Sequence, residues 1–183
     1  MKKFFSTTSI SYIALFIAFL AILGGIAIPI GPISITLGSL GVYLVSSLLY
    51  TPYAVVTIGL YILMGALGLP VFSNFEGGIA KLLGPTGGYI LGFLLCAFIE
   101  SFLISKFKNK KWIFPISMLI GTLVIYLFGT LWFLVIANGK YDFWQILMIC
   151  VIPFIPLDLV KIVIASLVGM RFRKYVDKEL DIN

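Results

Sequence analysis

The 183 residues of the chain include no histidine. Histidine is the commonest metal ligand and the commonest general base in proteins, so its absence argues against a metal centre and against Ser-His hydrolysis. Charge is also scarce, because only 11% of the residues are charged, against about a quarter in soluble domains. Hydrophobic residues make up 61%. The composition therefore predicts a polytopic membrane protein.

The chain has only two cysteines and no nucleotide-binding motif. Cys96 and Cys150 lie inside apolar runs, without the spacing of a zinc site or a disulfide framework, and are interpreted as small buried hydrophobes. Neither GxxxxGK[ST] nor GxGxxG occurs. We therefore expect no metal, no cofactor and no nucleotide site in this chain. Energy for uphill transport would have to come from an ion gradient or from a partner.

Six apolar runs of about the length that crosses a bilayer fit into the chain. They predict a single all-α transmembrane domain over residues 1–183, with six helices and no separate soluble domain. The first run lacks a clear cleavage site and is expected to remain as a helix. Pro153 and Pro156 must break the last apolar block, which is too long for one straight span. The expected spans are residues 10–28, 33–50, 53–67, 84–104, 112–137 and 156–172.

A glycine-rich stretch, residues 68–93, separates the third run from the fourth. Its seven glycines and two prolines favour a loop over a continuous helix. Lipid offers backbone amides no hydrogen-bond partners, so irregular backbone in a membrane protein must be shielded or must line a cavity. This loop is therefore expected to cover a site.

Basic residues predict the topology. They cluster in residues 2–3, 106–111 and 171–178, all on one side of a six-span arrangement, whereas Lys81 and Lys140 fall on the other side. The positive-inside rule then predicts cytoplasmic termini and an extracellular glycine-rich loop. The net charge of +6 is accordingly a topology signal and gives no support for nucleic-acid binding.

Three ionisable residues fall inside expected spans. Asp158 lies in the first turn of the last span, near the positive end of the helix dipole, and Lys161 lies on the same face. Intramembrane charges indicate a functional site by default, but the two residues also fit a structural pair that neutralises itself. Both interpretations stay open. Glu100 is expected to extend toward the lysines at 106–111 and is left out of the site.

Ala14 and Ala18 form a small-xxx-small pair on the first expected helix. Such a pair lets two helix backbones approach closely in lipid. The pattern alone fits a partner protein and packing within the same chain equally well.

Three long strings of the sequence are specific enough to compare with known families: ITLGSLGVYLVSSLLY, ILMGALGLPVFSNFEGGIAKLLGPTGGYILGF and PFIPLDLVK. Together they resemble the biotin-specific substrate-binding subunits (BioY family) of energy-coupling factor transporters. The resemblance implies a six-helix subunit of the bacterial cell membrane that captures biotin from outside. It also implies a transmembrane coupling subunit, which would dock on Ala14 and Ala18, and two cytoplasmic ATPases, which alone would use ATP.

Biotin has a ureido ring with two N–H donors, an apolar ring system and a carboxylate tail. On the resemblance, Asp158 and Asn74 are expected at the ureido group, and Lys161 at the carboxylate or as a support for Asp158. Aromatic residues would cover the rings. The expected substrate site comprises Asn74, Asp158, Lys161, Tyr89, Thr36 and Phe72. The chain departs from the usual family pattern at Gly38, Asn74, Phe75 and Leu157.

Two other classes of function compete with this hypothesis. An ion-coupled secondary transporter is typically built from internal repeats with matching broken helices, and only the last span is predicted to be broken. An intramembrane enzyme would use Asp158 as its base, but the sequence shows no nucleophile beside a plausible base.

Overall fold

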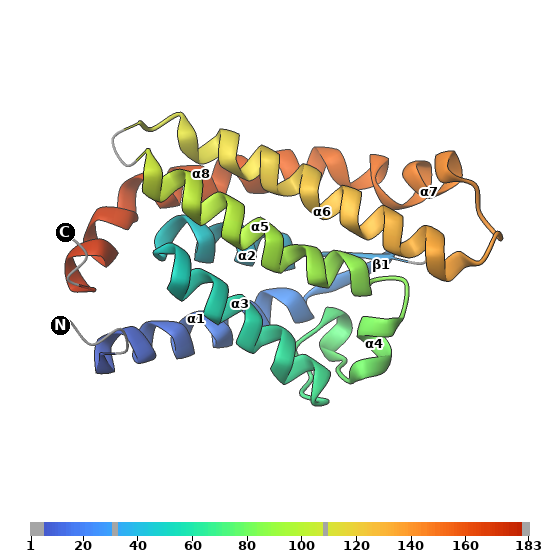
Figure 1. The fold of residues 1–183 in the computed structure, drawn as a ribbon, viewed down its shortest axis with the longest axis horizontal. Coiled ribbons are helices and arrows are strands. Elements are labelled where there is room, and N and C mark those ends of the chain that lie inside the picture. Colours follow the sequence, from blue (N-terminus) through green and yellow to red (C-terminus); the bar gives the residue numbers. More distant parts are fainter. Residues whose placement is uncertain (1–5, 31–32, 108–109, 181–183) are drawn as a thin grey trace.

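The computed structural model describes residues 6–30, 33–107 and 110–180. The chain forms a helical bundle along one long axis, with a small two-stranded hairpin toward one end (Figure 1). Its elements are α1 (Thr7–Gly25), β1 (Ala27–Ile30), β2 (Ile33–Thr36), α2 (Gly38–Leu48), α3 (Thr51–Ala66), η1 (Ser73–Phe75), α4 (Ile79–Leu83), α5 (Gly87–Lys106), α6 (Ile113–Ala137), α7 (Phe143–Cys150), η2 (Ile152–Phe154) and α8 (Ile155–Glu179).

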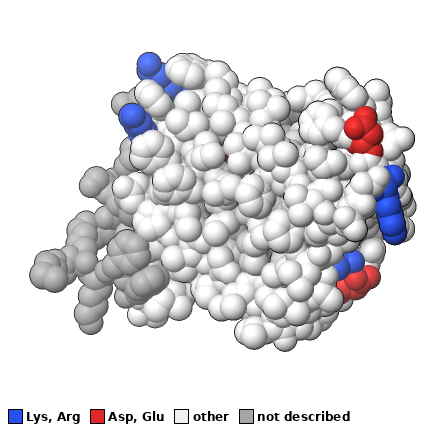
Figure 2. Space-filling view, turned by 45° about the vertical axis from the view of Figure 1, so that its right-hand side comes forward, with Lys and Arg blue, Asp and Glu red and all other residues white. Residues whose placement is uncertain are grey.

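The helices have the apolar character that the composition predicts. Among the described residues, α1, α5, α6 and the block Phe143–Glu179 are long and apolar enough to cross a membrane, and α2 and α3 are apolar but shorter. Figure 2 shows a broad face almost without charged side chains, with the coloured residues near its margins. The structure thus agrees with a mostly helical membrane protein, although the described helices provide four clear spans instead of six.

The second expected span, residues 33–50, is only partly helical. Residues 33–36 form β2, which pairs antiparallel with β1 from Ala27↔Thr36 to Ile30↔Ile33. Alternating Ile and Ser or Thr favours an extended strand, and Pro29 cannot continue a helix because it lacks a backbone N–H. The same hairpin ends α1 at Gly25, before the predicted boundary at residue 28.

The glycine-rich stretch interrupts the helices as predicted, and α5 begins at Gly87, three residues after the expected start at residue 84. Gly68 and Gly78 adopt φ angles of 101° and 100°, which residues with a Cβ rarely tolerate. Phe72 is buried with 1% of its surface exposed, and its ring lies against Gly65 of α3, where an added Cβ would collide with it. The loop therefore packs back onto the bundle.

The last apolar block breaks where its prolines predict. Helix α7 ends at Cys150, and α8 begins at Ile155 with Pro156 in its first turn. Helix α8 continues to Glu179, well past the expected boundary at residue 172. Helix α1 begins and α8 ends at the same end of the bundle (Figure 1). Three lysines used for the predicted topology, Lys2, Lys3 and Lys108, lie outside the described residues.

Helices α2 and α8 pack closely along their length. A Cβ added to Gly169 of α8 would lie 2.8 Å from the Cβ of Ser47 on α2, so glycine is needed for this close approach. One turn further, Nη1 of Arg173 donates a 3.0 Å hydrogen bond to the carbonyl oxygen of Ser47. Nη2 of Arg173 donates a 2.9 Å bond to Oγ of Ser105 on α5. Arg173 therefore ties three helices together at the end of the bundle that carries the termini.

The expectation for Glu100 is wrong. Its side chain is completely buried and points into the bundle, where Oε2 accepts a long 3.8 Å contact from the Cys96 thiol. Oε1 has no hydrogen-bond partner among the described residues. The reason is the helix face: Glu100 shares its face of α5 with the buried residues Cys96, Ala97 and Ile104, and this face is turned away from lipid.

Candidate functional site

A hollow opens between β2, α5, α6 and the α7–α8 break, and we call it the polar hollow. It contains about 430 Å³ of empty space, part of which is open to the outside. Its lining residues are Ile33, Ser34, Thr36, Ser39, Tyr89, Phe93, Ile125, Tyr126, Cys150, Phe154, Asp158 and Lys161. A neighbouring space, the loop hollow, shares five of these residues and extends to Phe72, Ser73 and Thr86 at the glycine-rich loop.

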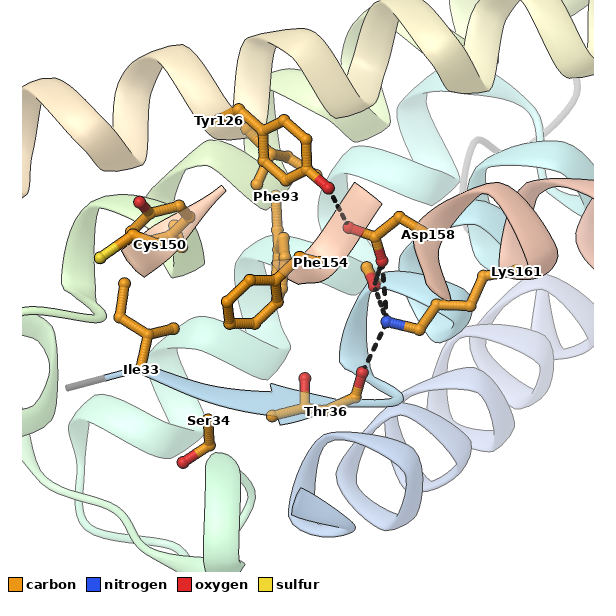
Figure 3. A pocket seen from close by; sticks show the side chains of 12 residues that line it. Ile33, Ser34, Thr36, Phe93, Tyr126, Cys150, Phe154, Asp158 and Lys161 are labelled. Atoms are coloured by element: carbon orange, nitrogen blue, oxygen red, sulfur yellow. Dashed lines mark hydrogen bonds and ion pairs between the residues drawn. The ribbon is translucent and has the colours of Figure 1, made fainter. Parts of the chain in front are cut away.

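Asp158 lines the polar hollow, and both of its carboxylate oxygens are held by hydrogen bonds (Figure 3). Its Oδ1 accepts hydrogen bonds from Lys161 Nζ at 2.8 Å and from Ser39 Oγ at 3.1 Å. Its Oδ2 accepts one bond, from the hydroxyl of Tyr126 at 2.6 Å. A carboxylate oxygen can accept about two hydrogen bonds, so Oδ2 keeps capacity for a further donor.

Lys161 has all of its protons engaged by the protein. Besides the bond to Asp158, Nζ donates to the carbonyl oxygen of Thr36 at 2.8 Å and to Ser39 Oγ at 2.9 Å. An ammonium group has three donors, and these contacts use all three. Lys161 thus fixes the carboxylate of Asp158 and the junction between β2 and α2 at the same time.

The rest of the hollow is apolar with a few hydroxyl groups. Phe93, Phe154 and Ile33 contribute ring and aliphatic surface. The hydroxyl of Tyr89 is buried without a hydrogen-bond partner in the described part of the chain. A buried polar group without a partner is costly, and Tyr89 is one of the residues that line the hollow. The hollow therefore suits a small ligand with apolar rings and N–H donors.

The structure brings most of the sequence-predicted site residues to these two hollows. Asp158, Lys161, Thr36 and Tyr89 line the polar hollow, and Phe72 lines the loop hollow. Thr36 accepts the hydrogen bond from Lys161 with its backbone carbonyl oxygen. Its side-chain Oγ1 accepts a 3.1 Å bond from the backbone N–H of Gly38 instead.

Asn74 lies apart from the other predicted residues. Its side chain is exposed, and it lines neither hollow, whereas its neighbour Ser73 lines the loop hollow. Asn74 has a left-handed backbone with φ of 61°, a conformation in which asparagine is enriched. The conformation of the loop gives a reason for asparagine at this position.

Sequence reasoning missed several residues of the site. Tyr126 and Ser39, which bind Asp158 directly, were not predicted, and neither were Ser34, Phe93 and Cys150. A signal existed for Tyr126, because a phenol in the middle of an apolar helix usually needs a hydrogen-bond partner. Ser34 lies in strand β2, which was predicted as helix, so the side of the chain on which its side chain lies was not predicted either.

Ala14 and Ala18 are both exposed on α1. The buried face of this helix is formed by other residues, among them Ile13, Ile17 and Leu20. No other segment of the described chain buries the two alanines, so the packing of the described residues gives no reason for them.

Comparison with known proteins gives a consistent result. The sequence model of the BioY family matches residues 1–178. The chain is 36% identical over 160 residues to "Biotin transporter BioY" of Thermotoga maritima, covering 87% of this chain and 92% of that protein. It is also 36% identical over 164 residues to "Probable biotin transporter BioY" of Pyrococcus horikoshii, covering 90% and 95%.

A solved structure shares the fold. The chain superposes with a TM-score of 0.84 and 30% identity on the crystal structure at 2.1 Å of the S-component for biotin from an ECF-type ABC transporter. The match covers 91% of this chain and 90% of that one.

Proposed function

The chain belongs to the BioY family, and from that premise we propose that it is the substrate-binding subunit of an energy-coupling factor transporter and that its substrate is biotin. The observation that carries the proposal is a buried carboxylate, Asp158, held at the edge of an apolar hollow in a chain of this family. Among its relatives are proteins named biotin transporters.

The geometry of the polar hollow supports biotin as the ligand. Oδ2 of Asp158 has room for an N–H donor of the ureido ring, and a hydrogen bond to a charged acceptor contributes about 1.5 to 3 kcal/mol. Phe93 and Phe154 provide apolar surface for the ring system. The hydroxyl of Tyr89, which lines the hollow, would serve as a further polar contact.

Lys161 supports Asp158 in this proposal and does not bind the carboxylate of biotin. Each of its three donors already has a protein acceptor. A ligand carboxylate would have to displace one of these bonds inside the protein. The two interpretations from the sequence then combine: Lys161 is the structural partner, and Asp158 is the group that faces the ligand.

The arrangement in the membrane and the partners are part of the proposal. Counting the β2–α2 segment and α3 as crossings gives six spans, with both termini in the cytoplasm and the glycine-rich loop outside. The common end of α1 and α8 supports this topology. Ala14 and Ala18 form an exposed small-residue face on α1, where a transmembrane coupling subunit would dock. ATP would be used only by two cytoplasmic ATPase subunits.

An intramembrane enzyme is the less favoured function. The structure brings Ser39 Oγ to 2.9 Å from Lys161 Nζ. The two residues are a hydroxyl nucleophile and an amine, and their proximity was not predicted from the sequence. A lysine activates a serine only when its nitrogen can accept a proton. This nitrogen donates to Asp158, Ser39 and Thr36 together, so it has no lone pair for that role.

Binding of labelled biotin to the detergent-purified protein tests the proposal. With EDTA present and nucleotide absent, we expect saturable binding, because the site consists of side chains of this chain alone. Mass spectrometry of the untreated preparation would show whether biotin co-purifies. Absence of saturable binding, or binding that requires ATP, would refute the proposed function.

A further inference from the structure

A second recess lies far from the polar hollow, between the start of α6 and the last turns of α8. We call it the basic groove, and it spans about 1310 Å³ of empty space that is partly open to the outside. Lys111 lines it from the α6 side, and Arg171, Lys174 and Lys178 line it from α8. Asp177 is the only acidic residue among the described residues that line it.

The positive charge of the basic groove is not neutralised within the described chain. Asp177 lies 3.5 Å from Nε of Arg173, so its charge is already used by a buried arginine. Lys111, Arg171, Lys174 and Lys178 form no ion pair with any described residue. The groove therefore presents four uncompensated cationic side chains.

These charges are held close together by a fixed helix. Arg171, Lys174 and Lys178 follow one another at spacings of three and four residues, which places them on one face of α8. The opposite face is anchored by Val176, which is buried in the bundle. Like charges at these spacings repel each other, so an anion in the groove removes an unfavourable interaction.

The floor of the basic groove is apolar. Phe114 is buried with 6% of its surface exposed, and it lines the groove together with Met170. Tyr175 at the groove and Trp112 beside it expose 67% and 52% of their surfaces. Exposed Trp and Tyr are typical of the membrane–water interface. The groove thus combines a cationic rim, an apolar floor and an interfacial position.

We propose that the basic groove is a binding site for the headgroup of an anionic phospholipid. The phosphate would lie between Lys111 and the basic face of α8, and the start of the acyl chains would lie against Phe114 and Met170. Basic recesses between transmembrane helices are suited to such headgroups. An acidic protein surface fits less well, because the apolar floor calls for an amphiphile.

The basic groove shares no lining residue with the other two sites. Helix α1, which carries Ala14 and Ala18, lies along one long side of the bundle and α6 along the other, while the last turns of α8 extend toward the start of α1 (Figure 1). Neither alanine lines the groove, and no residue of the polar hollow does. The proposed lipid site therefore consists of residues different from those of the polar hollow and of the proposed docking face.

Lipid titration of the purified protein, followed by native mass spectrometry, tests this inference. Phosphatidylglycerol is compared with phosphatidylcholine for the wild type, for Lys174→Gln with Lys178→Gln, and for the control Lys106→Gln with Lys110→Gln. Each lysine near an anionic lipid is worth about 1 kcal/mol, or about fivefold in affinity. We expect the groove variant to bind phosphatidylglycerol about 25-fold more weakly. We expect the control, which removes the same charge outside the groove, to bind it as the wild type does.

Four outcomes would overturn the inference. Equal losses in both variants would mean that the lysines attract anionic lipid only as a diffuse surface charge. Equal binding of phosphatidylglycerol and phosphatidylcholine would show that the groove does not select an anionic headgroup. Displacement of phosphatidylglycerol by inorganic phosphate at the same concentration would indicate a site for free anions. Unchanged lipid binding with lost assembly with the coupling subunit would indicate an acidic protein partner. Biotin binding should be the same in all variants, so the result does not depend on the proposed function.

Discussion

The hydroxyl of Tyr126 donates a 2.6 Å hydrogen bond to Oδ2 of Asp158, which joins the middle of α6 to the first turn of α8. Oδ1 of the same carboxylate is held by Lys161 and Ser39. Both oxygens are therefore fixed by side chains from different helices. The direction in which Asp158 presents Oδ2 to the polar hollow depends on Tyr126.

Replacing Tyr126 with phenylalanine should weaken biotin binding by about tenfold, because losing a bond to a charged group costs about 1.5 kcal/mol or more. Isothermal titration calorimetry of the purified variant measures the effect. Tyr141→Phe, a change in an exposed tyrosine, serves as the control. Equal affinities for wild type and Tyr126→Phe would show that this hydroxyl has no part in aiming the carboxylate.

Asp158→Asn should both destabilise the protein and abolish tight binding. The change leaves the ammonium of Lys161 buried without its counter-charge, at a cost of about 3 to 5 kcal/mol. Adding Lys161→Met should restore thermal stability but not affinity, which we expect to stay about 10- to 100-fold below wild type. If the double variant binds biotin as wild type does, the pair is structural only.

Cys150 offers a chemical probe of the polar hollow, because it lines this space whereas Cys96 does not. In a Cys96→Ala background, we expect slow alkylation of Cys150 by a small thiol reagent and strong protection by saturating biotin. Mass spectrometry follows the modification over time. Alkylation at the same rate with and without biotin would place the ligand elsewhere.

Ala14→Trp together with Ala18→Trp should leave biotin binding intact and abolish uptake. Two indole rings on this exposed face would hold a partner helix away from α1. The control is Leu123→Trp with Leu127→Trp, an exposed pair at the same spacing on α6. Co-purification with the coupling subunit distinguishes the variants, and normal assembly of the Ala14 and Ala18 variant would exclude this face as the docking surface.

Substitutions of Asn74 separate a ligand contact from a role in loop conformation. Glycine accepts the positive φ of 61° without strain, whereas alanine there costs about 1 kcal/mol. From the exposed position of Asn74, we expect Asn74→Gly to keep the affinity for biotin and Asn74→Ala to lower the stability of the loop. Equal loss of affinity in both variants would instead support the contact with the ureido group predicted from the sequence.

The sequence predicts the long helices well because each is governed by local information. The expected span 112–137 differs from α6 (Ile113–Ala137) by one residue at its start, since the lysines before it and Gly139 after it bound the apolar run. Pro153 and Pro156 likewise place the break before α8. The hairpin is harder to recognise, because the alternation that favours a strand covers only the four residues of β2 and lies within an apolar run that also fits a membrane helix.

The site is predictable where charge or motif makes a residue stand out. Asp158 and Lys161 are conspicuous in an apolar span, and both line the polar hollow. Ser39 and Tyr126 are polar residues of ordinary appearance, and only the packing of α2 and α6 against α8 brings them to the carboxylate. Glu100 was misjudged for the same reason, since the orientation of its helix face depends on tertiary packing.

The hairpin also determines how deep the polar hollow lies. Helix α2 has 11 residues and is about 16 Å long, about half of a 30 Å hydrocarbon layer. In the proposed six-span topology, strand β2 completes this crossing, and strand edges are excluded from contact with lipid tails. The hollow would then reach only about halfway into the layer, from the surface farther from the termini. A fluorophore attached at Cys150 should accordingly be quenched by iodide in the water on that side more strongly than by brominated lipid tails.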